Sequence, residues 1–325
     1  RSTQSRSSAA SDVYKRQVVI WSAPLDAPGY MGAEGALVEF LKGGGRLFLS
    51  GQDIGYLDGG GGWDIAPYYR DYLKARWLRD DAHSTTLSGA PGGPFSGLAI
   101  TIAGPGGADN QLFPDEVTSA DPDAAVPTWL YAGDGCGGLQ IGTCLDYRAL
   151  YFAFGFEGIT SRALRREVMQ RALGWLAAPP ATVGVELTPG AQTLIGPPGS
   201  TLTHTLRLRH VGQAGVPDTF VVEVHGADWA TTLSTASVVL SPCHTAEVYV
   251  RVSVPITAGW NERDVFTVTA RSTLSPALAQ RALLTSKAPA PVLLVDDDRF
   301  YDQGPKYRAA MEAAGLPYDL SLIHI

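Results

Sequence analysis

The turn that follows the apolar run at residues 46–50 carries the residues best placed to do chemistry. It reads Ser50-Gly51-Gln52-Asp53. A hydroxyl held on a sharp turn between a strand and a helix can attack a carbonyl carbon when a neighbouring base accepts its proton. Ser50 is therefore a candidate nucleophile, with Asp53 and Glu157 as candidate acid–base residues.

The same turn also has a non-catalytic interpretation. No G-x-S-x-G motif surrounds Ser50, and no histidine is obviously placed to activate it. The backbone amides of Gly51, Gln52 and Asp53 could instead bind a ligand, or the turn could simply pack. Glu157, which follows a predicted strand, could equally cap or salt-bridge the next helix.

An acidic stretch supplies the candidate metal ligands. Asp109, Asp115 and Glu116 carry the oxygen atoms that calcium prefers. Their spacing is not that of an EF-hand, so a solvated loop is the alternative. None of the six histidines falls in a zinc-binding motif. We therefore expect no cofactor, and calcium binding by the acidic stretch is the alternative to a solvated loop.

The chain has three cysteines. Cys136 and Cys144 flank a glycine-rich, hairpin-like segment, and this spacing favours a disulfide between them. A reduced pair is the alternative, and Cys243 has no evident partner. Such a bond, together with few lysines and a sandwich module, indicates an exported protein.

Strands and helices that alternate along residues 18–178 must position the turn at Ser50. Apolar runs at 18–21, 46–50 and 150–156 predict buried strands, and residues 31–42, 65–78 and 161–176 carry helical spacing. This alternation predicts an α/β flavodoxin-like fold, a parallel sheet with helices on both faces.

The periodicity changes to two after Pro179-Pro180. Residues 181–286 alternate apolar and polar side chains between Gly/Pro turns, as in an all-β immunoglobulin-like sandwich. Residues 290–319 then predict the opening βα unit of a second, truncated α/β domain. Residues 1–17 and 320–325 read as translated sequencing adaptor, from the strings SSAASDVYKRQ and LSLIHI.

Composition narrows the function further. The formal charge is −7, the mean hydropathy is +0.02, and no run of about 18 apolar residues predicts a membrane span. Because phosphate binding needs clustered Lys and Arg, we expect no nucleic-acid partner.

Several longer strings support a family resemblance. The first domain resembles the class I glutamine-amidotransferase-like superfamily in its trehalose-utilisation-like branch, through VVIWSAP, ALVEFLKGGGRLFLSGQDIGY, PYYRDYLKARWLRDD, GGADNQLFPDEV and YFAFGFEGI. The string PGSTLTHTLRLRHVGQAGVPDTFVVEVHGADWATTLS is similar to the immunoglobulin-like modules that follow such domains. The resemblance implies a large secreted multidomain or peptidase-associated bacterial protein. It also implies a degenerate site, because Ser50 stands where that family needs a cysteine.

These observations predict a non-catalytic binding or spacer fragment, located outside the cell or at its surface. Its partners would be other domains of the same chain and a cell-surface glycan or protein. A hydrolase, whether an amidase, an esterase or a peptidase-associated enzyme, is the first alternative, using Ser50 or carboxylates at strand ends. A carbohydrate-binding module is the second, using Trp63, Tyr68 and Tyr69 as exposed aromatics.

Overall fold

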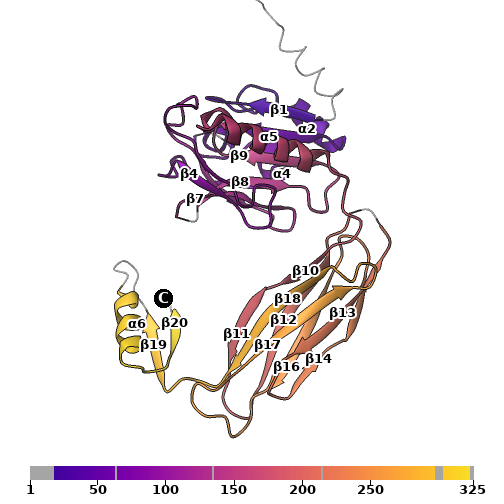
Figure 1. Cartoon of the computed structure of the whole chain (residues 1–325), viewed down its shortest axis with the longest axis vertical. Coiled ribbons are helices and arrows are strands. Elements are labelled where there is room, and N and C mark those ends of the chain that lie inside the picture. The colour runs from indigo at the N-terminus through magenta and orange to yellow at the C-terminus, as the bar shows by residue number, and fades with distance from the viewer. Residues whose placement is uncertain (1–17, 63, 134, 214, 297–302, 323–325) are drawn as a thin grey trace, which may run out of the picture. The chain divides into compact units, whose positions relative to one another are not determined.

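The computed structural model describes residues 18–322, apart from residues 63, 134, 214 and 297–302. The chain forms two compact units that divide between Pro179 and Pro180. Figure 1 shows helices on the first unit and long strands in the second.

The first unit contains nine strands and four α-helices in its described residues. The strands are β1 (Val18–Ser22), β2 (Arg46–Ser50), β3 (Ala75–Arg79), β4 (Thr86–Gly89), β5 (Ala99–Thr101), β6 (Glu116–Ser119), β7 (Ala125–Tyr131), β8 (Cys136–Ile141) and β9 (Arg148–Phe152). The helices are α2 (Glu34–Lys42), α3 (Ile54–Asp58), α4 (Pro67–Asp71), the 3-10 turn η1 (Phe156–Gly158) and α5 (Arg162–Ala177).

The sheet of the first unit is mixed rather than parallel. Its order is β1-β2-β9-β8-β7-β4-β5, while β3 pairs with β6 and β6 joins β8. Only β1, β2 and β9 run parallel to one another, and every other pairing is antiparallel. The predicted flavodoxin-like fold is therefore wrong, and so is the amidotransferase-like resemblance, because such a domain would have a parallel sheet.

The error arises between residues 75 and 141, where short strands pair with one another. The helix predicted over residues 65–78 is only the five residues of α4. Lys74 takes a left-handed backbone conformation with φ 52°, which ends the helical path, and Trp77 continues on β3. The aromatic residues that predicted one helix are therefore divided between two elements, with Tyr68 and Tyr69 on α4 and Trp77 on β3.

Apolar residues on opposite faces of β2 enter two different cores. Leu47 and Leu49 share one cluster with Leu37 and Leu41 of α2. Phe48 lies in the other cluster, beside Val168, Ala172 and Leu176 of α5. The alternation of β2 therefore fixes which side chains reach each core, and Ser50 ends the strand between them.

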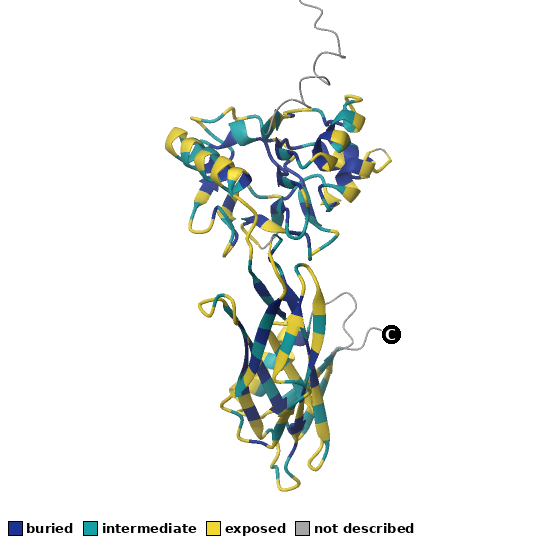
Figure 2. Ribbon diagram, turned by 90° about the vertical axis from the view of Figure 1, so that its right-hand side faces the viewer, coloured by how far each residue is buried: buried dark blue, intermediate teal, exposed yellow. Residues whose placement is uncertain are grey.

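The second unit is a sandwich of two sheets, which confirms the β-sandwich predicted from the alternating pattern. One sheet has the order β10-β12-β16-β14 and the other β11-β18-β17-β13-β15. All pairings are antiparallel except that of β11 with β18. The inward residues of β16, Val248, Val250 and Val252, are buried, and Figure 2 shows the same alternation along the strands.

The strands of this sandwich are β10 (Val185–Thr188), β11 (Ala191–Ile195), β12 (Thr201–His210), β13 (Asp218–His225), β14 (Thr231–Leu233), β15 (Ser237–Leu240), β16 (Thr245–Ser253), β17 (Arg263–Ser272) and β18 (Ala279–Lys287). A parallel strand pair then follows, β19 (Val292–Asp296) and β20 (Tyr318–Leu322), with α6 (Gly304–Ala313) between them. Asp319 of β20 ion-pairs with Lys287 and accepts a hydrogen bond from the Ala290 N–H at 2.7 Å.

Candidate functional site

Ser50 lies at the carboxyl end of β2, where its side chain is almost fully buried. Its backbone carbonyl accepts a hydrogen bond from the Ala23 N–H at 2.8 Å, and the Gly51 N–H donates to the Phe152 carbonyl at 3.2 Å. A β-carbon at Gly51 would stand 2.0 Å from the Ala23 carbonyl oxygen, so only glycine fits there. Within the described residues, the Ser50 hydroxyl has no hydrogen bond to a histidine or a carboxylate. The structure therefore does not assemble a nucleophile–base pair around Ser50.

Gln52 connects three loops through its amide. Its Nε2 donates to the Pro24 carbonyl at 3.2 Å, and its Oε1 accepts from the N–H groups of Leu112 and Phe113 at 2.7 and 3.2 Å. The residue is 1% exposed. Its side-chain donors and acceptor thus serve the fold, and ligand binding by this turn stays a prediction.

The side chain of Asp115 accepts hydrogen bonds from the backbone N–H groups at the start of α3. Its Oδ2 accepts hydrogen bonds from the N–H groups of Gly55 and Tyr56 at 2.7 and 3.3 Å, and its Oδ1 accepts from Trp77 Nε1 at 2.8 Å. Burial raises the pKa of Asp115 well above its usual value, and these donors only partly oppose the shift. The sequence marked Asp115 as a metal ligand, whereas the structure places it as an internal helix cap.

Asp53 is the titratable group of the turn. Its side chain makes no capping hydrogen bond to α3. Burial, and then the charge of Asp80, raise the pKa of Asp53 to about 6. Burial and the neighbouring Asp81 raise the pKa of Asp80 as well. A carboxyl group that titrates near neutral pH is one that can exchange a proton with a ligand.

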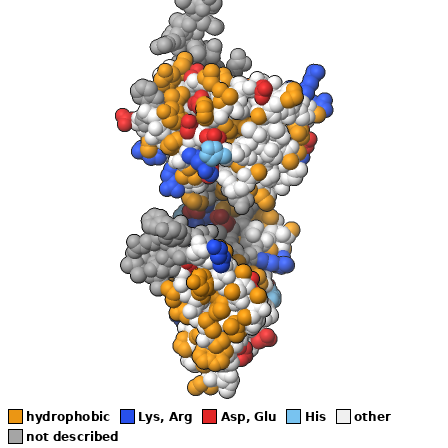
Figure 3. All heavy atoms as spheres, turned by 90° about the vertical axis from the view of Figure 1, so that its left-hand side faces the viewer, with side chains coloured by type: hydrophobic (Ala, Val, Ile, Leu, Met, Phe, Trp, Pro, Cys, Tyr) orange, Lys and Arg blue, Asp and Glu red, His pale blue; other side chains and the backbone are white. Residues whose placement is uncertain are grey.

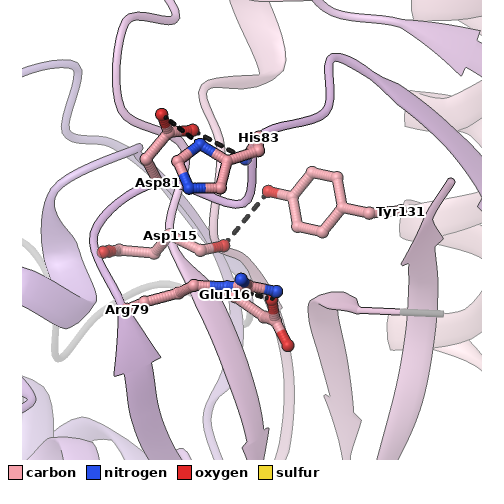
Figure 4. A network of polar contacts seen from close by, with 6 residues as sticks. All are labelled: Arg79, Asp81, His83, Asp115, Glu116 and Tyr131. Atoms are coloured by element: carbon pink, nitrogen blue, oxygen red, sulfur yellow. Dashed lines mark hydrogen bonds and ion pairs between the residues drawn. The ribbon is translucent and has the colours of Figure 1, made fainter. Parts of the chain in front are cut away.

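Figure 4 shows the polar network beside Asp115. Tyr131 donates its hydroxyl hydrogen to the Asp115 backbone carbonyl at 3.1 Å. His83 lies over Asp81, with Nδ1 2.8 Å from Oδ2, and the pair is exposed. Glu116 pairs with Arg79, whose Nε lies 2.6 Å from Oε2.

Glu157 lies on η1, and its hydrogen bonds go to residues other than Ser50. Its Oε1 accepts from Asn110 Nδ2 at 3.1 Å and from Gln111 Nε2 at 3.4 Å, while its Oε2 is buried with no hydrogen-bond partner among the described residues. The helix that follows is capped by Ser161, whose Oγ accepts from the Leu164 N–H. Glu157 therefore holds the loop at residues 110–111 in place.

The three predicted calcium ligands take different partners. Asp109 accepts a hydrogen bond from the Gly104 N–H at 2.7 Å, and it is exposed. Asp115 is fully buried, and Glu116 pairs with Arg79. Within the described residues, no group of three His, Cys, Asp or Glu side chains is arranged to hold a metal ion.

The predicted bond between Cys136 and Cys144 is wrong. Cys136 is a free thiol at the start of β8, where its Sγ donates to the Gly138 carbonyl, and burial raises its pKa to about 11. Because an extended strand rises about 3.3 Å per residue, β8 carries the chain far from Cys136 before it reaches Cys144. Cys144 is disulfide-bonded, and so is Cys243.

Two of the three aromatic residues proposed for glycan binding are not on the surface. Tyr68 and Tyr69 are both fully buried, so that prediction is wrong for them, and Trp63 lies outside the described residues. The Tyr68 hydroxyl donates to Asp58 Oδ2 at 2.7 Å. Sequence reasoning did not identify Asp58, whose only local signal is an acidic residue before four glycines.

No protein-family model and no curated protein matches this chain. Among solved structures, it is similar to the ASH/PapD-like domain of human CEP192, at 18% identity and TM-score 0.28, over 34% of this chain and 89% of that one. It is also similar to the E. coli chaperone DraB, at 14% identity and TM-score 0.25, over 34% of this chain and 56% of that one. A third similar structure is SSP-19 of Caenorhabditis elegans, an MSP-domain protein like family member, at 14% identity and TM-score 0.23, over 31% and 96%. With TM-scores this far below 0.5, none of these similarities carries an argument about function.

Proposed function

We propose that this chain is a non-catalytic binding and spacer segment of a large exported bacterial multidomain protein. The observation that carries the proposal is the hydrogen bonding of Asp115 to the amides of Gly55 and Tyr56. Hydrolysis of an amide or ester develops an oxyanion, which needs open N–H donors beside the nucleophile. In this chain the Gly51 N–H is paired with the Phe152 carbonyl, and the Gly55 and Tyr56 N–H groups of the helix after the turn are paired with the Asp115 carboxylate.

The cysteines and the sandwich support export and a spacer role. Cys144 and Cys243 are disulfide-bonded, and disulfides persist mainly in oxidising compartments outside the cytosol. No helix in the described part of the chain is long and apolar enough to cross a membrane. On the face that Figure 3 shows, the Lys and Arg side chains of the first unit lie mainly at two edges, and acidic and apolar side chains occupy the surface between them. These features fit partners such as neighbouring domains of the same chain and a cell-surface glycan or protein.

A hydrolase is the second candidate, and Asp53 favours it. A carboxyl group with a pKa of about 6 beside a second carboxyl group can serve as general acid or base near neutral pH. In this version Asp53 would act with Asp80, and Ser50 would have no required part.

The two candidates are separated by assaying the full chain with p-nitrophenyl esters and peptide anilides between pH 5 and 8. The proposal expects turnover at the rate of the buffer blank, unchanged in Ser50→Ala and Asp53→Asn. Ser22→Ala is the matched control, because Ser22 lies opposite Ser50 in the register of β1 and β2. Turnover that disappears only in Ser50→Ala or Asp53→Asn would establish the hydrolase instead.

A further inference from the structure

The first unit contains a pocket of about 360 Å³ beside α3 and α4. This volume lies within the range of sites for small molecules. The pocket is lined by Gly29, Tyr30, Glu34, Leu57, Asp58, Asp64, Ile65, Ala66 and Pro67. None of these residues belongs to the turn at Ser50.

Asp58 connects the two walls of the pocket. Its carboxylate accepts hydrogen bonds from the N–H groups of Gly29 and Tyr30 at 2.7 and 3.0 Å. Its backbone carbonyl accepts from the Ala66 N–H at 2.8 Å. Glu34 adds a second connection, because its Oε1 accepts from the Tyr68 N–H at 3.2 Å. Both walls are therefore fixed before any ligand arrives.

The charge of the pocket is negative and uncompensated. Glu34, Asp58 and Asp64 line it, and its lining contains no Lys, Arg or His. Asp58 is 3% exposed, and its partners in the described chain are only N–H and O–H dipoles. These hydrogen bonds hold the carboxylate in place but do not neutralise its charge, so a cation in the pocket would be attracted to it. The negative charge of Asp58 also affects Asp26, because burial and then this charge raise the pKa of Asp26.

The rim of the pocket is apolar. Tyr30 is 59% exposed and Ile65 is 50% exposed, and Leu57 and Pro67 also line the pocket. An aromatic ring attracts a cation over its face and also covers a hydrocarbon chain. The pocket thus combines acidic side chains with apolar side chains that can contact a hydrocarbon group.

We propose that this pocket binds a small organic cation, with a primary ammonium group directed at Asp58 and an aliphatic chain or ring against Tyr30 and Ile65. Glu34 and Asp64 add negative charge to the lining of the pocket. This inference rests on the proposed binding role and gives it a ligand class. A metal ion fits less well, because no three acidic or histidine side chains of the described chain are arranged around one point.

The test is titration of the full chain with pentylamine, followed by ¹H–¹⁵N correlation spectra. Saturable shifts are expected at the amides of Gly29, Tyr30 and Ala66, and 1-pentanol, which has the same chain without the charge, should not produce them. Raising the salt concentration should weaken pentylamine binding. A second titration uses Nα-acetyl-lysine amide, which presents a lysine side chain without a free α-amino group. If it binds as well as pentylamine does, the natural ligand is a lysine side chain of a protein or peptide. If only pentylamine binds, the natural ligand is a free small amine.

Two variants test the pocket without changing Asp58, whose substitution by Asn could prevent folding. Glu34→Gln retains the oxygen that accepts from Tyr68, and Asp64→Asn changes an exposed side chain. Each should weaken pentylamine binding by up to about fivefold, the effect of one exposed ion pair. Glu39→Gln, also on α2 but outside the pocket, is the matched control and should bind as the parent does.

Three outcomes would overturn the inference: equal shifts with 1-pentanol, saturation of the pocket by calcium chloride in preference to the amine, or unchanged affinity in the Glu34→Gln/Asp64→Asn double variant. Each leaves the hydrolysis assays unaffected, so failure here is distinguishable from failure of the non-catalytic role.

Discussion

Asp115 accepts a hydrogen bond from the Gly55 N–H at 2.7 Å, across 60 positions of sequence. The contact joins the loop before β6 to the first turn of α3. Two further donors, the Tyr56 N–H and Trp77 Nε1, complete the cap. The carboxylate therefore stabilises the helix that follows the Ser50 turn and also fills the place where an anion would bind.

Asp115→Asn should destabilise the first unit. An asparagine amide keeps one accepting oxygen and puts an NH2 donor in place of the other, so at least one buried donor loses its partner. We expect the free energy of unfolding to fall by about 1–3 kcal/mol, measured by urea denaturation. Asp109→Asn is the control, because Asp109 is exposed and an asparagine oxygen can still accept from Gly104. Equal effects of the two substitutions would contradict the capping role.

The pKa of Asp53 predicts a pH dependence of stability. Its value of about 6 in the folded chain is above the value near 4 of an unfolded aspartate. The folded state thus binds the proton more tightly, and the free energy of unfolding should decrease as pH rises from about 4 to about 6. Asp53→Asn removes this loss. Because Asp53 is half exposed, the variant should be more stable than the parent by no more than about 1 kcal/mol at pH 8, and equal at pH 4.

This pH effect is measured by amide hydrogen exchange of β2 and β9 at the two pH values. Asp80→Asn provides a second check, because removing the Asp80 charge should lower the pKa of Asp53 in a carboxyl-carbon titration. A variant Asp53→Asn that is equally stabilised at pH 4 and pH 8 would show that the effect is packing rather than charge.

The sequence identified elements whose signals are local. The apolar run that ends at Ser50 is β2, and the helix predicted to begin near Ser161 does begin there, capped by its Oγ. The sandwich followed from a period of two maintained over many residues. In each case neighbouring residues contain the whole signal.

The site could be predicted only in part, because its contacts join distant segments. Nothing near Asp115 in sequence indicates that its carboxylate meets Gly55, and nothing near Asp58 indicates that it holds Gly29. Tyr68 and Tyr69 read as surface aromatics, yet the Tyr69 ring packs edge-on against Tyr151 of β9 and the Tyr68 hydroxyl donates to Asp58. The antiparallel pairings between residues 75 and 141 were missed because their short strands carry weak periodicity.

The burial of His204 leads us to expect that acid destabilises the sandwich. It is buried between the sheets, where its Nδ1 lies 3.0 Å from Gln192 Oε1 and its Nε2 2.9 Å from Ser286 Oγ. Burial lowers the pKa of His204, so the unfolded chain binds the proton more tightly. Stability is complete above about pH 6.5 and is lost as the pH falls below that value. The protection of the β12 amides, which is the intrinsic exchange rate divided by the observed rate at the same pH, should fall at pH 5, and His204→Gln should reduce this fall. An equal fall in both proteins would assign the acid sensitivity to other groups.

The cysteines give the last prediction. Cys136 is a free thiol, whereas Cys144 and Cys243 are disulfide-bonded. Iodoacetamide added to the unfolded, unreduced chain should therefore add one carbamidomethyl group, at Cys136, and three after reduction. In the folded chain this labelling should be slow at pH 8, because burial raises the pKa of the Cys136 thiol to about 11 and little thiolate is present. Cys136→Ser is the control and should take up no label until it is reduced. Three labels on the unreduced chain, read by mass spectrometry of protein purified from an oxidising compartment, would remove the main support for export.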